Sequence, residues 1–336
     1  MPHVSAILLC YNCAGLVAAA VRSLLAQDYT GPVEVIVSDD ASSDDTFDLA
    51  CRELAGCRSD WVIRTFRRAT NSGSKSAHLN DVLPRAAGDI LISFDADDVA
   101  DPSRIRKTVA AFAADPVVQA VYSGFSLIDK DGRPLGTGRV PHPPSNVDTR
   151  RWFAQVDAYA AGATLAIRRP VAEVFGPLEP DIHEDIVLPF RASLLGEAVY
   201  LDEPLVRYRR HASSMTADLD RFASLEAYRT RMLLGIARAR RHLESRHADL
   251  LTAARLMPQR AEEFASLRSI ADQSLASAES TAQLVSDRLA DRVAALVRLT
   301  RSGAYRDEWA QHAALALAPG AYLRYKRKSL GVNRAD

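Results

Sequence analysis

The sequence predicts an α/β fold, with a Rossmann-like, mixed but mostly parallel sheet flanked by helices and followed by a C-terminal all-helical extension. Strand-like and helix-like segments alternate over residues 1–115 with short connections, which is the pattern of βαβ units. Polar clusters follow the strand-like segments, and strand signals stop near residue 215. Because ligands bind beyond the carboxyl ends of strands in open α/β sheets, we expect these polar clusters to converge in space.

Four segments predict strands in the first part of the chain, and the first of them, Val4–Leu9, is a continuous apolar run of the kind that marks a strand buried on both faces. The segments are Val4–Leu9, Val33–Ser38, Trp61–Phe66 and Asp89–Phe94. A helical pattern follows each segment. The four expected helices cover residues 16–27, residues 43–54 with Ser43 or Asp44 as the cap, residues 76–87 up to Gly88, and residues 101–114 with Asp101 as the cap and Pro102 in the first turn.

The remainder of the first 215 residues mixes strands and helices. Residues 120–136 predict a strand that turns back at residues 130–132, because Asp-Gly favours a hairpin turn. Further strands are expected at residues 162–169 and 198–211, and a helix at residues 184–196.

After Met215 the apolar residues follow a helical period. Leu219, Phe222, Leu225, Met232, Ile236 and Leu243 predict one helix, and Phe264, Leu267, Ile270, Leu289, Val293 and Leu296 predict one further long helix after Pro258. We therefore expect a domain of residues 1–215 and a helical C-terminal region of residues 216–336. Pairing of two chains into a homodimer and simple coverage of one chain are both open for this region.

The composition is that of an ordinary globular protein, with 42 basic and 42 acidic side chains. A balanced charge gives no reason to expect nucleic acid as a partner. Short apolar runs, no basic leader and only four cysteines favour a cytoplasmic protein with reduced thiols. The basic stretch of residues 324–328 has two interpretations, a solvated tail or a peripheral contact with anionic lipid at the inner face of the membrane.

The acidic cluster that closes the fourth strand is the strongest chemical signal. Asp95, Asp97 and Asp98 lie within four residues, and carboxylates this close repel one another unless a cation compensates them. Mg²⁺ and Mn²⁺ prefer oxygen ligands and are commonly shared between carboxylates and substrate phosphates. We therefore expect Asp97 and Asp98 to bind Mn²⁺ or Mg²⁺.

Four blocks in this order resemble the family 2 glycosyltransferases, which have the GT-A fold. The blocks are "VSAILLCYNCAGLVAAAVRSLLAQDY", "VEVIVSDDASSDDT", "ILISFDADDVADPSR" and "HEDIVLPFRASLLG" with "YRRH" downstream. The resemblance covers residues 1–215 and leaves the helical region outside. It implies a nucleotide-binding half over residues 1–100 and an acceptor half over residues 101–215.

The resemblance also implies roles for single residues on the donor side. Tyr11 would stack on or flank the nucleobase, and Asp40 would hydrogen-bond the uracil or its neighbour. Asp97 would contact the ribose and metal region, Asp98 would bind the metal that holds the diphosphate, and His211 would complete metal or diphosphate binding.

Further contacts are implied around these residues. Asn71 matches an asparagine of the family pattern near the donor, whereas His78 occupies a place where arginine is frequent and would hold the nucleotide less firmly. Arg209 and Arg210 are placed to steady the leaving group.

The acid pair of the fourth block would carry the proton transfer. The resemblance implies that Asp185 is the general base, with Glu184 sharing or taking that role. The reaction would invert the anomeric centre, as in a hexosyltransferase. A UDP-sugar is the default donor, and the acceptor is a glycan, a lipid-linked molecule or a protein, as in bacterial surface-glycan synthesis.

Alternatives stay open at this point. Glu184 and Asp185 also suit the first turn of a helix, His211 suits a surface position, and Tyr11 suits a core. The cluster also fits an aspartyl phosphotransferase with Asp95 as the nucleophile, although that motif normally ends the first strand. A third alternative is a protein that binds a nucleotide sugar without catalysis.

Overall fold

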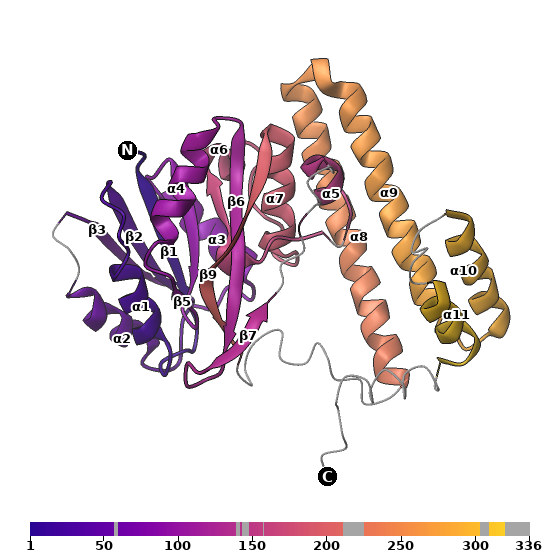
Figure 1. Ribbon diagram of the computed structural model, residues 1–336, viewed down its shortest axis with the longest axis horizontal. Coiled ribbons are helices and arrows are strands. Elements are labelled where there is room, and N and C mark those ends of the chain that lie inside the picture. The colour runs from indigo at the N-terminus through magenta and orange to yellow at the C-terminus, as the bar shows by residue number, and fades with distance from the viewer. Residues whose placement is uncertain are drawn as a thin grey trace, which may run out of the picture.

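The computed structural model describes residues 1–56, 60–138, 142, 148–156, 158–210, 225–302 and 309–319. In this part of the chain a mixed sheet with helices on both faces lies beside a group of long helices (Figure 1). The predicted α/β fold and its C-terminal helical extension are therefore confirmed. The expected division near residue 215 stays a prediction, because residues 211–224 lie outside the described ranges.

A single sheet of nine strands organises the first domain, with the order β3-β2-β1-β4-β8-β6-β9-β5 and with β7 paired to β6. The strands are β1 Val4–Cys10, β2 Val33–Asp39, β3 Val62–Arg67, β4 Ile90–Asp95, β5 Val99–Ala100, β6 Val118–Ile128, β7 Pro134–Gly138, β8 Ala166–Arg168 and β9 Glu197–Arg209. Neighbours β3, β2, β1 and β4 run parallel. Their carboxyl ends therefore share one edge, and the polar loops that follow them meet there.

Alternate residues of the parallel strands enter two separate hydrophobic cores, as the two-residue period of a strand requires. Ala6 and Leu8 face one core, whereas Ile7 and Leu9 face the other. The first core is covered by α1 Val17–Leu25, α2 Thr46–Leu54 and α4 Arg104–Ala114. The second is covered by α3 Lys75–Val82, α5 Thr149–Phe153 and α7 Glu184–Leu195, with α6 Arg169–Glu173 beside them.

Two expected helices have different bounds in the structure, and one short strand was not expected. The third helix ends at Val82 and continues only as a 3-10 turn, Leu83–Arg85, because Pro84 cannot donate a helical hydrogen bond. The fourth helix begins at Arg104 after Ser103, and Asp101 accepts hydrogen bonds from Ser103 instead of capping the helix. Strand β5 was not predicted, since two residues carry no period.

The helical region contains α8 Leu225–Leu256, α9 Ala261–Gln283, α10 Leu289–Ser302 and α11 Trp309–Leu317 (Figure 1). The prediction of one long helix after Pro258 is wrong, because the chain turns between α9 and α10. Leu284 and Val285 at this turn are buried in a small core with Ala295, Leu299 and Leu315. Burial of these side chains requires α10 to fold back on α9. No helix in the described ranges is long and apolar enough to span a bilayer.

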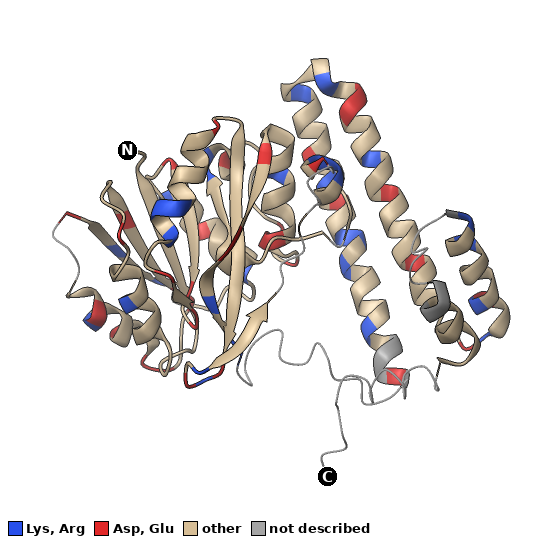
Figure 2. Cartoon of the chain, viewed as in Figure 1, with Lys and Arg blue, Asp and Glu red and all other residues tan. Residues whose placement is uncertain are grey.

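A buried ion pair joins the helical region to the sheet domain. Arg191 on α7 lies 3.0 Å from Asp249 on α8, and both side chains are 4% exposed. Arg246 on α8 adds hydrogen bonds to the carbonyl oxygens of Phe153 (3.2 Å) and Gln155 (2.8 Å). Elsewhere along α8 and α9, Figure 2 shows acidic and basic residues interspersed. The contact between the two regions is therefore partly ionic and closed to water.

We predict that Asp249→Ala lowers the free energy of unfolding by about 3–5 kcal/mol, because it leaves the buried Arg191 guanidinium without its counter-ion. Urea unfolding measures the loss. Arg240→Ala is the matched control, since Arg240 pairs with Glu279 on the surface at 62% exposure and should cost less than about 1 kcal/mol. Equal losses in the two variants would contradict the prediction.

Candidate active site

Two loops at the carboxyl edge of the sheet hold each other in place. After β1, the amide of Asn12 donates to Ser42 Oγ, and the Asn12 side chain accepts from the amide of Ser43, both at 2.9 Å. Asn12 and Ala41 have φ angles of 45° and 60°, a left-handed conformation that non-glycine residues rarely adopt. Such strain persists where surrounding contacts enforce it, and it is concentrated at functional sites.

The paired aspartates after β2 both act on loop backbone. Asp39 is fully buried and accepts from the amide and hydroxyl of Ser42. Asp40 accepts from the amide of Ser72 at 2.8 Å, from its hydroxyl at 2.6 Å and from Asn71 Nδ2 at 3.1 Å, and it pairs with Arg68 at 3.1 Å. These contacts use the lone pairs that a carboxylate offers. Asp40 and Asn71, both expected near the donor, therefore fix the loop of residues 68–73.

The two aromatic candidates lie in different environments. Tyr11, directly after β1, is 53% exposed and presents its ring to solvent at the sheet edge. His78 is buried on α3, and its Nε2 lies 2.8 Å from Ser38 Oγ. Burial lowers the pKa of His78 below its ordinary value, so the ring is neutral at pH 7. Its observed partner is a side chain of β2.

The acidic cluster closes β4 as the sequence predicts. Asp98 is buried, and its Oδ1 accepts from the amide of Arg209 at 2.7 Å, whereas its Oδ2 is buried without a hydrogen-bond partner. Burial, followed by the charges of Asp97 and Asp95, raises the pKa of Asp98 well above its ordinary value. A cation at this point would relieve both the desolvation and the repulsion.

Two arginines pack against the cluster from inside the protein. The Arg104 guanidinium is buried over the Phe94 ring and donates to the carbonyl oxygen of Ser93 at 2.6 Å. Burial lowers the pKa of Arg104 to about 10, although the nearby aspartates oppose this change. Arg209, expected near the leaving group, donates to the carbonyl oxygen of Asp97 at 2.8 Å. Its guanidinium also holds the turn after β6.

Arg210 and His211, expected to contact the diphosphate and the metal, follow β9 in the sequence. The Arg210 amide donates to the carbonyl oxygen of Ile128, and the Arg210 side chain is exposed. His211 lies outside the described residues. Within the described ranges no three acidic, histidine or cysteine side chains already form a metal-binding group. The available donors are nevertheless hard carboxylate oxygens, one of them unpartnered, and they fit a Mg²⁺ or Mn²⁺ ion.

The acid pair begins α7, and a lysine that sequence reasoning missed lies beside it. Lys75 Nζ donates to Glu184 Oε1 at 2.9 Å and to Asp95 Oδ1 at 2.8 Å. Burial alone would lower the pKa of Lys75, but the two carboxylates raise it well above its ordinary value. Lys75 is therefore a fixed cation between β4 and α7.

Asp185 differs from its neighbour. Its carboxylate forms no ion pair with another described side chain, and its carbonyl oxygen accepts from the amide of Ala160 at 2.9 Å. Burial, reinforced by the charge of Glu184, raises the pKa of Asp185 to about 8 even though Lys75 opposes this rise. Such a carboxyl group can exchange a proton near neutral pH.

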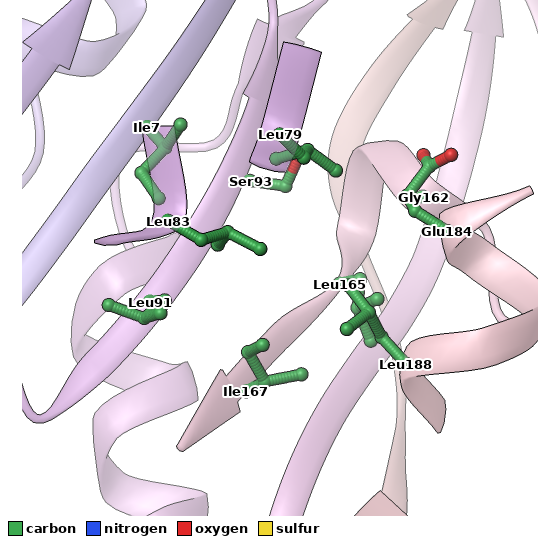
Figure 3. Close-up of a pocket in the computed structure, with 10 residues that line it drawn as sticks. All are labelled: Ile7, Leu79, Leu83, Leu91, Ser93, Gly162, Leu165, Ile167, Glu184 and Leu188. Carbon is green, nitrogen blue, oxygen red and sulfur yellow. The ribbon is translucent and has the colours of Figure 1, made fainter. Parts of the chain in front are cut away.

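The first acid of the pair lies against apolar side chains. A cavity of about 20 Å³ lies next to Glu184, large enough for about one water molecule. In Figure 3 the Glu184 carboxylate lies at its edge beside Gly162, and aliphatic side chains such as Leu165 and Ile167 line the rest. A Cβ on Gly162 would lie 2.6 Å from Glu184 Oε1. Only glycine therefore leaves room for the ion pair as observed.

Helix α3 also fixes the segment that leads into the acid pair. Ser74 Oγ donates to the carbonyl oxygen of Pro180 and Ser76 Oγ to that of Ile182, both at 2.5 Å. Asn80 exchanges two hydrogen bonds of 2.7 Å with the backbone of Leu178. The polar residues of "SKSAHLN" are the sequence signal that could have indicated this role, since four of them lie on so short a helix.

Comparison with known proteins places the chain in a family. The profile described as Glycosyl transferase family 2 matches residues 5–175. An uncharacterized glycosyltransferase of Nostoc sp. is 27% identical over 217 residues, which are 63% of this chain and 66% of that protein. EpsE of Bacillus subtilis, named as a glycosyltransferase, is 36% identical over 131 residues, or 39% of this chain and 46% of EpsE. The match thus spans about half to two thirds of these relatives' lengths.

Solved structures share the fold at low sequence identity. S. aureus TarS 1-349 in complex with UDP-GlcNAc aligns with a TM-score of 0.54 and 17% identity, over 90% of this chain and 93% of that one. The mannosyltransferase PcManGT from Pyrobaculum calidifontis, in complex with GDP-Man and Mn²⁺, aligns with a TM-score of 0.55 and 18% identity, over 99% and 81% of the two chains. Both alignments confirm the fold class.

The environment of Asp185 predicts how stability depends on pH. Because its folded pKa of about 8 lies above the unfolded value of about 3.9, the folded state retains a proton that the unfolded state releases between these values. Relative to Asp185→Asn, the wild type should lose about 1.4 kcal/mol per pH unit across this window and level off above pH 8. Chemical denaturation at pH 5, 7 and 9 measures this difference, and a constant difference would contradict it.

Proposed function

The chain belongs to glycosyl transferase family 2 and is a glycosyltransferase, and on that premise we propose that it transfers a sugar from a nucleotide diphosphate to an acceptor hydroxyl with inversion. The observation that supports this most directly is that two carboxylates of the site lack a full set of partners. Asp98 has a buried oxygen without a partner, and Asp185 lacks an ion-pair partner among the described residues. Lys75 connects the two groups through Asp95 and Glu184.

We propose a UDP-sugar as the donor. The exposed Tyr11 ring offers a face on which a nucleobase can stack, next to the loop that Asp40 and Asn71 hold in place. His78 is neutral and hydrogen-bonded to Ser38. We therefore propose that it packs beside the donor site without contributing a charge. The relatives in complex with UDP-GlcNAc and GDP-Man support a nucleotide sugar, and the choice of base is part of the proposal.

Asp97, Asp98 and His211 are the proposed ligands of Mn²⁺ or Mg²⁺. When bound, such an ion would neutralise the charge of the departing diphosphate. The buried Arg104 and the Arg209 guanidinium fix the backbone on either side of the aspartates, so the carboxylates are positioned before any ligand arrives. Arg210, exposed next to His211, is proposed to contact the diphosphate.

Asp185 is the proposed general base. It would take the proton of the acceptor hydroxyl while the hydroxyl oxygen forms a bond to the anomeric carbon. The bond from that carbon to the diphosphate oxygen breaks, and its electron pair leaves with the nucleotide. A single displacement of this kind inverts the centre. A pKa of about 8 gives Asp185 high proton affinity together with a usable ionised fraction near neutral pH.

The acceptor class is the least restricted part of the proposal. A hydroxyl of a glycan, of a lipid-linked molecule or of a protein satisfies the chemistry at Asp185. The basic residues 324–328, for which contact with a membrane is one of two interpretations, lie outside the described residues.

We predict that UDP raises the melting temperature by about 5 °C at one hundred times its dissociation constant, and only when Mn²⁺ is present. Differential scanning fluorimetry with UDP, GDP and ADP, each with and without Mn²⁺, makes the measurement. Asp98→Asn should remove the metal-dependent part of the shift. A larger shift with GDP would redirect the donor assignment, and equal shifts without metal would contradict the metal site.

Replacement of the base should affect turnover and leave donor binding intact. Asp185→Asn is expected to lower kcat by about 10²–10⁴-fold, the usual contribution of a general base. The UDP-induced melting shift of that variant should match the wild type, because the proposed donor contacts lie elsewhere. Activity within threefold of the wild type would assign the base to another residue.

A further inference from the structure

Among the described residues of the site, Lys75 forms ion pairs with both acidic groups, the one that closes β4 and the one that begins α7. It begins α3 and lies between Asp95, which ends β4, and Glu184, which begins α7. Its side chain is 19% exposed. A lysine held by two carboxylates at 2.8 Å and 2.9 Å is restricted in position and stays protonated.

The fixed lysine makes the two acids of α7 unequal. Glu184 is buried and its Oε1 accepts from Lys75 Nζ, so its side chain is held in place by the lysine, with Gly162 leaving the space. Asp185, one residue later, points from a different side of the helix, because successive helical residues are about 100° apart. It has no such counter-ion among the described residues.

The same helix positions the segment before the acids. Ser74, Ser76 and Asn80 bond to the backbone between Leu178 and Ile182. The ion pair of Lys75 therefore belongs to a larger contact in which α3 sets the location of the first turn of α7. Loss of the lysine charge alone should leave these backbone contacts in place, which separates its electrostatic role from a structural one.

We infer that Lys75 is a positioning residue of the transfer reaction: it links Asp95 on the donor side to Glu184 on the acceptor side, keeps Glu184 as a fixed carboxylate, and so reserves proton transfer for Asp185. The inference rests on the proposed function in that Asp185 is taken as the base. It supplies a physical reason, the ion pair with Lys75, why Glu184 would not share that role.

The charges around Asp185 predict opposite effects for the two partners. Those that face it are Glu184 on its own helix, Lys75 on α3, Asp95 on β4 and the Tyr159 hydroxyl from the segment before β8. Glu184 raises the pKa of Asp185 and Lys75 lowers it. Removing the lysine charge must therefore raise this pKa further, and removing the glutamate charge must lower it.

The experiment compares Lys75→Met, Lys75→Arg, Glu184→Gln and the double variant Lys75→Met with Glu184→Gln. The readouts are the acidic limb of kcat/KM against pH and the ¹³C carboxyl titration of Asp185, assigned with Asp185→Asn. Lys75→Met should move both upward by about one pH unit, with about tenfold lower activity at pH 7. Glu184→Gln should move both downward, and Lys75→Arg should stay close to the wild type.

The double variant removes both charges, so its titration should return toward that of the wild type. It also keeps the test valid where Lys75→Met folds poorly, since it does not leave the buried Glu184 carboxylate without its cation. Lys107→Met is the control for loss of a lysine, because Lys107 pairs with Glu203 and is not among the charges that face Asp185.

Two results would overturn the inference. One is a Lys75→Met variant whose Asp185 titration matches that of Lys107→Met. The other is an unchanged titration with UDP affinity reduced more than tenfold, which would make Lys75 a donor ligand. The titration needs no turnover, so it tests the link even if no donor is transferred. If the enzyme turns over but the acidic limb of its kcat/KM profile does not change in Lys75→Met, the inference about Lys75 is wrong and the proposed function still stands.

Discussion

Mutual repulsion among carboxylates is the constraint on which the rest of this site depends. Asp95, Asp97 and Asp98 close β4, and Glu184 and Asp185 approach them from α7. The protein compensates only part of this charge, with Lys75 between the two groups and Arg104 beneath the first. The uncompensated charge raises the pKa of two carboxyl groups of the site, those of Asp98 and Asp185. The chemistry follows from that unequal distribution, with a cation expected at one and a proton at the other.

Rigid loops allow this distribution to persist without a ligand. Asp40 holds the loop of residues 68–73, and Asn12 holds the loop after β2. The left-handed backbone of Asn12 and Ala41 is tolerated because these hydrogen bonds offset its strain. A donor entering beside Tyr11 would therefore meet a surface that needs little reorganisation. Affinity gained in this way comes from a smaller entropic cost of ordering the loops on binding, and not from additional contacts.

The sequence predicted what local patterns control. Strands β1, β2 and β4 are rich in apolar residues, and the convergence of the loops behind them follows from parallel strand order. It could not predict Lys75, because its two partners lie 20 and 109 positions away along the chain and no local period relates them. The break between α9 and α10 was missed for a similar reason. Leu284 and Val285 continue a helical pattern, and only their burial against α10 and α11 requires a turn.

The buried pair of Arg191 and Asp249 has a consequence for how this protein diversifies. Helical appendages attached through solvated surfaces can be exchanged among related enzymes as modules. In this protein, a different helical region would need an acidic residue in the position of Asp249 to pair with Arg191. Arg191 lies on the same helix as Glu184 and Asp185. The C-terminal helices and the acids proposed for catalysis should thus be inherited together, with recombination breakpoints between them selected against.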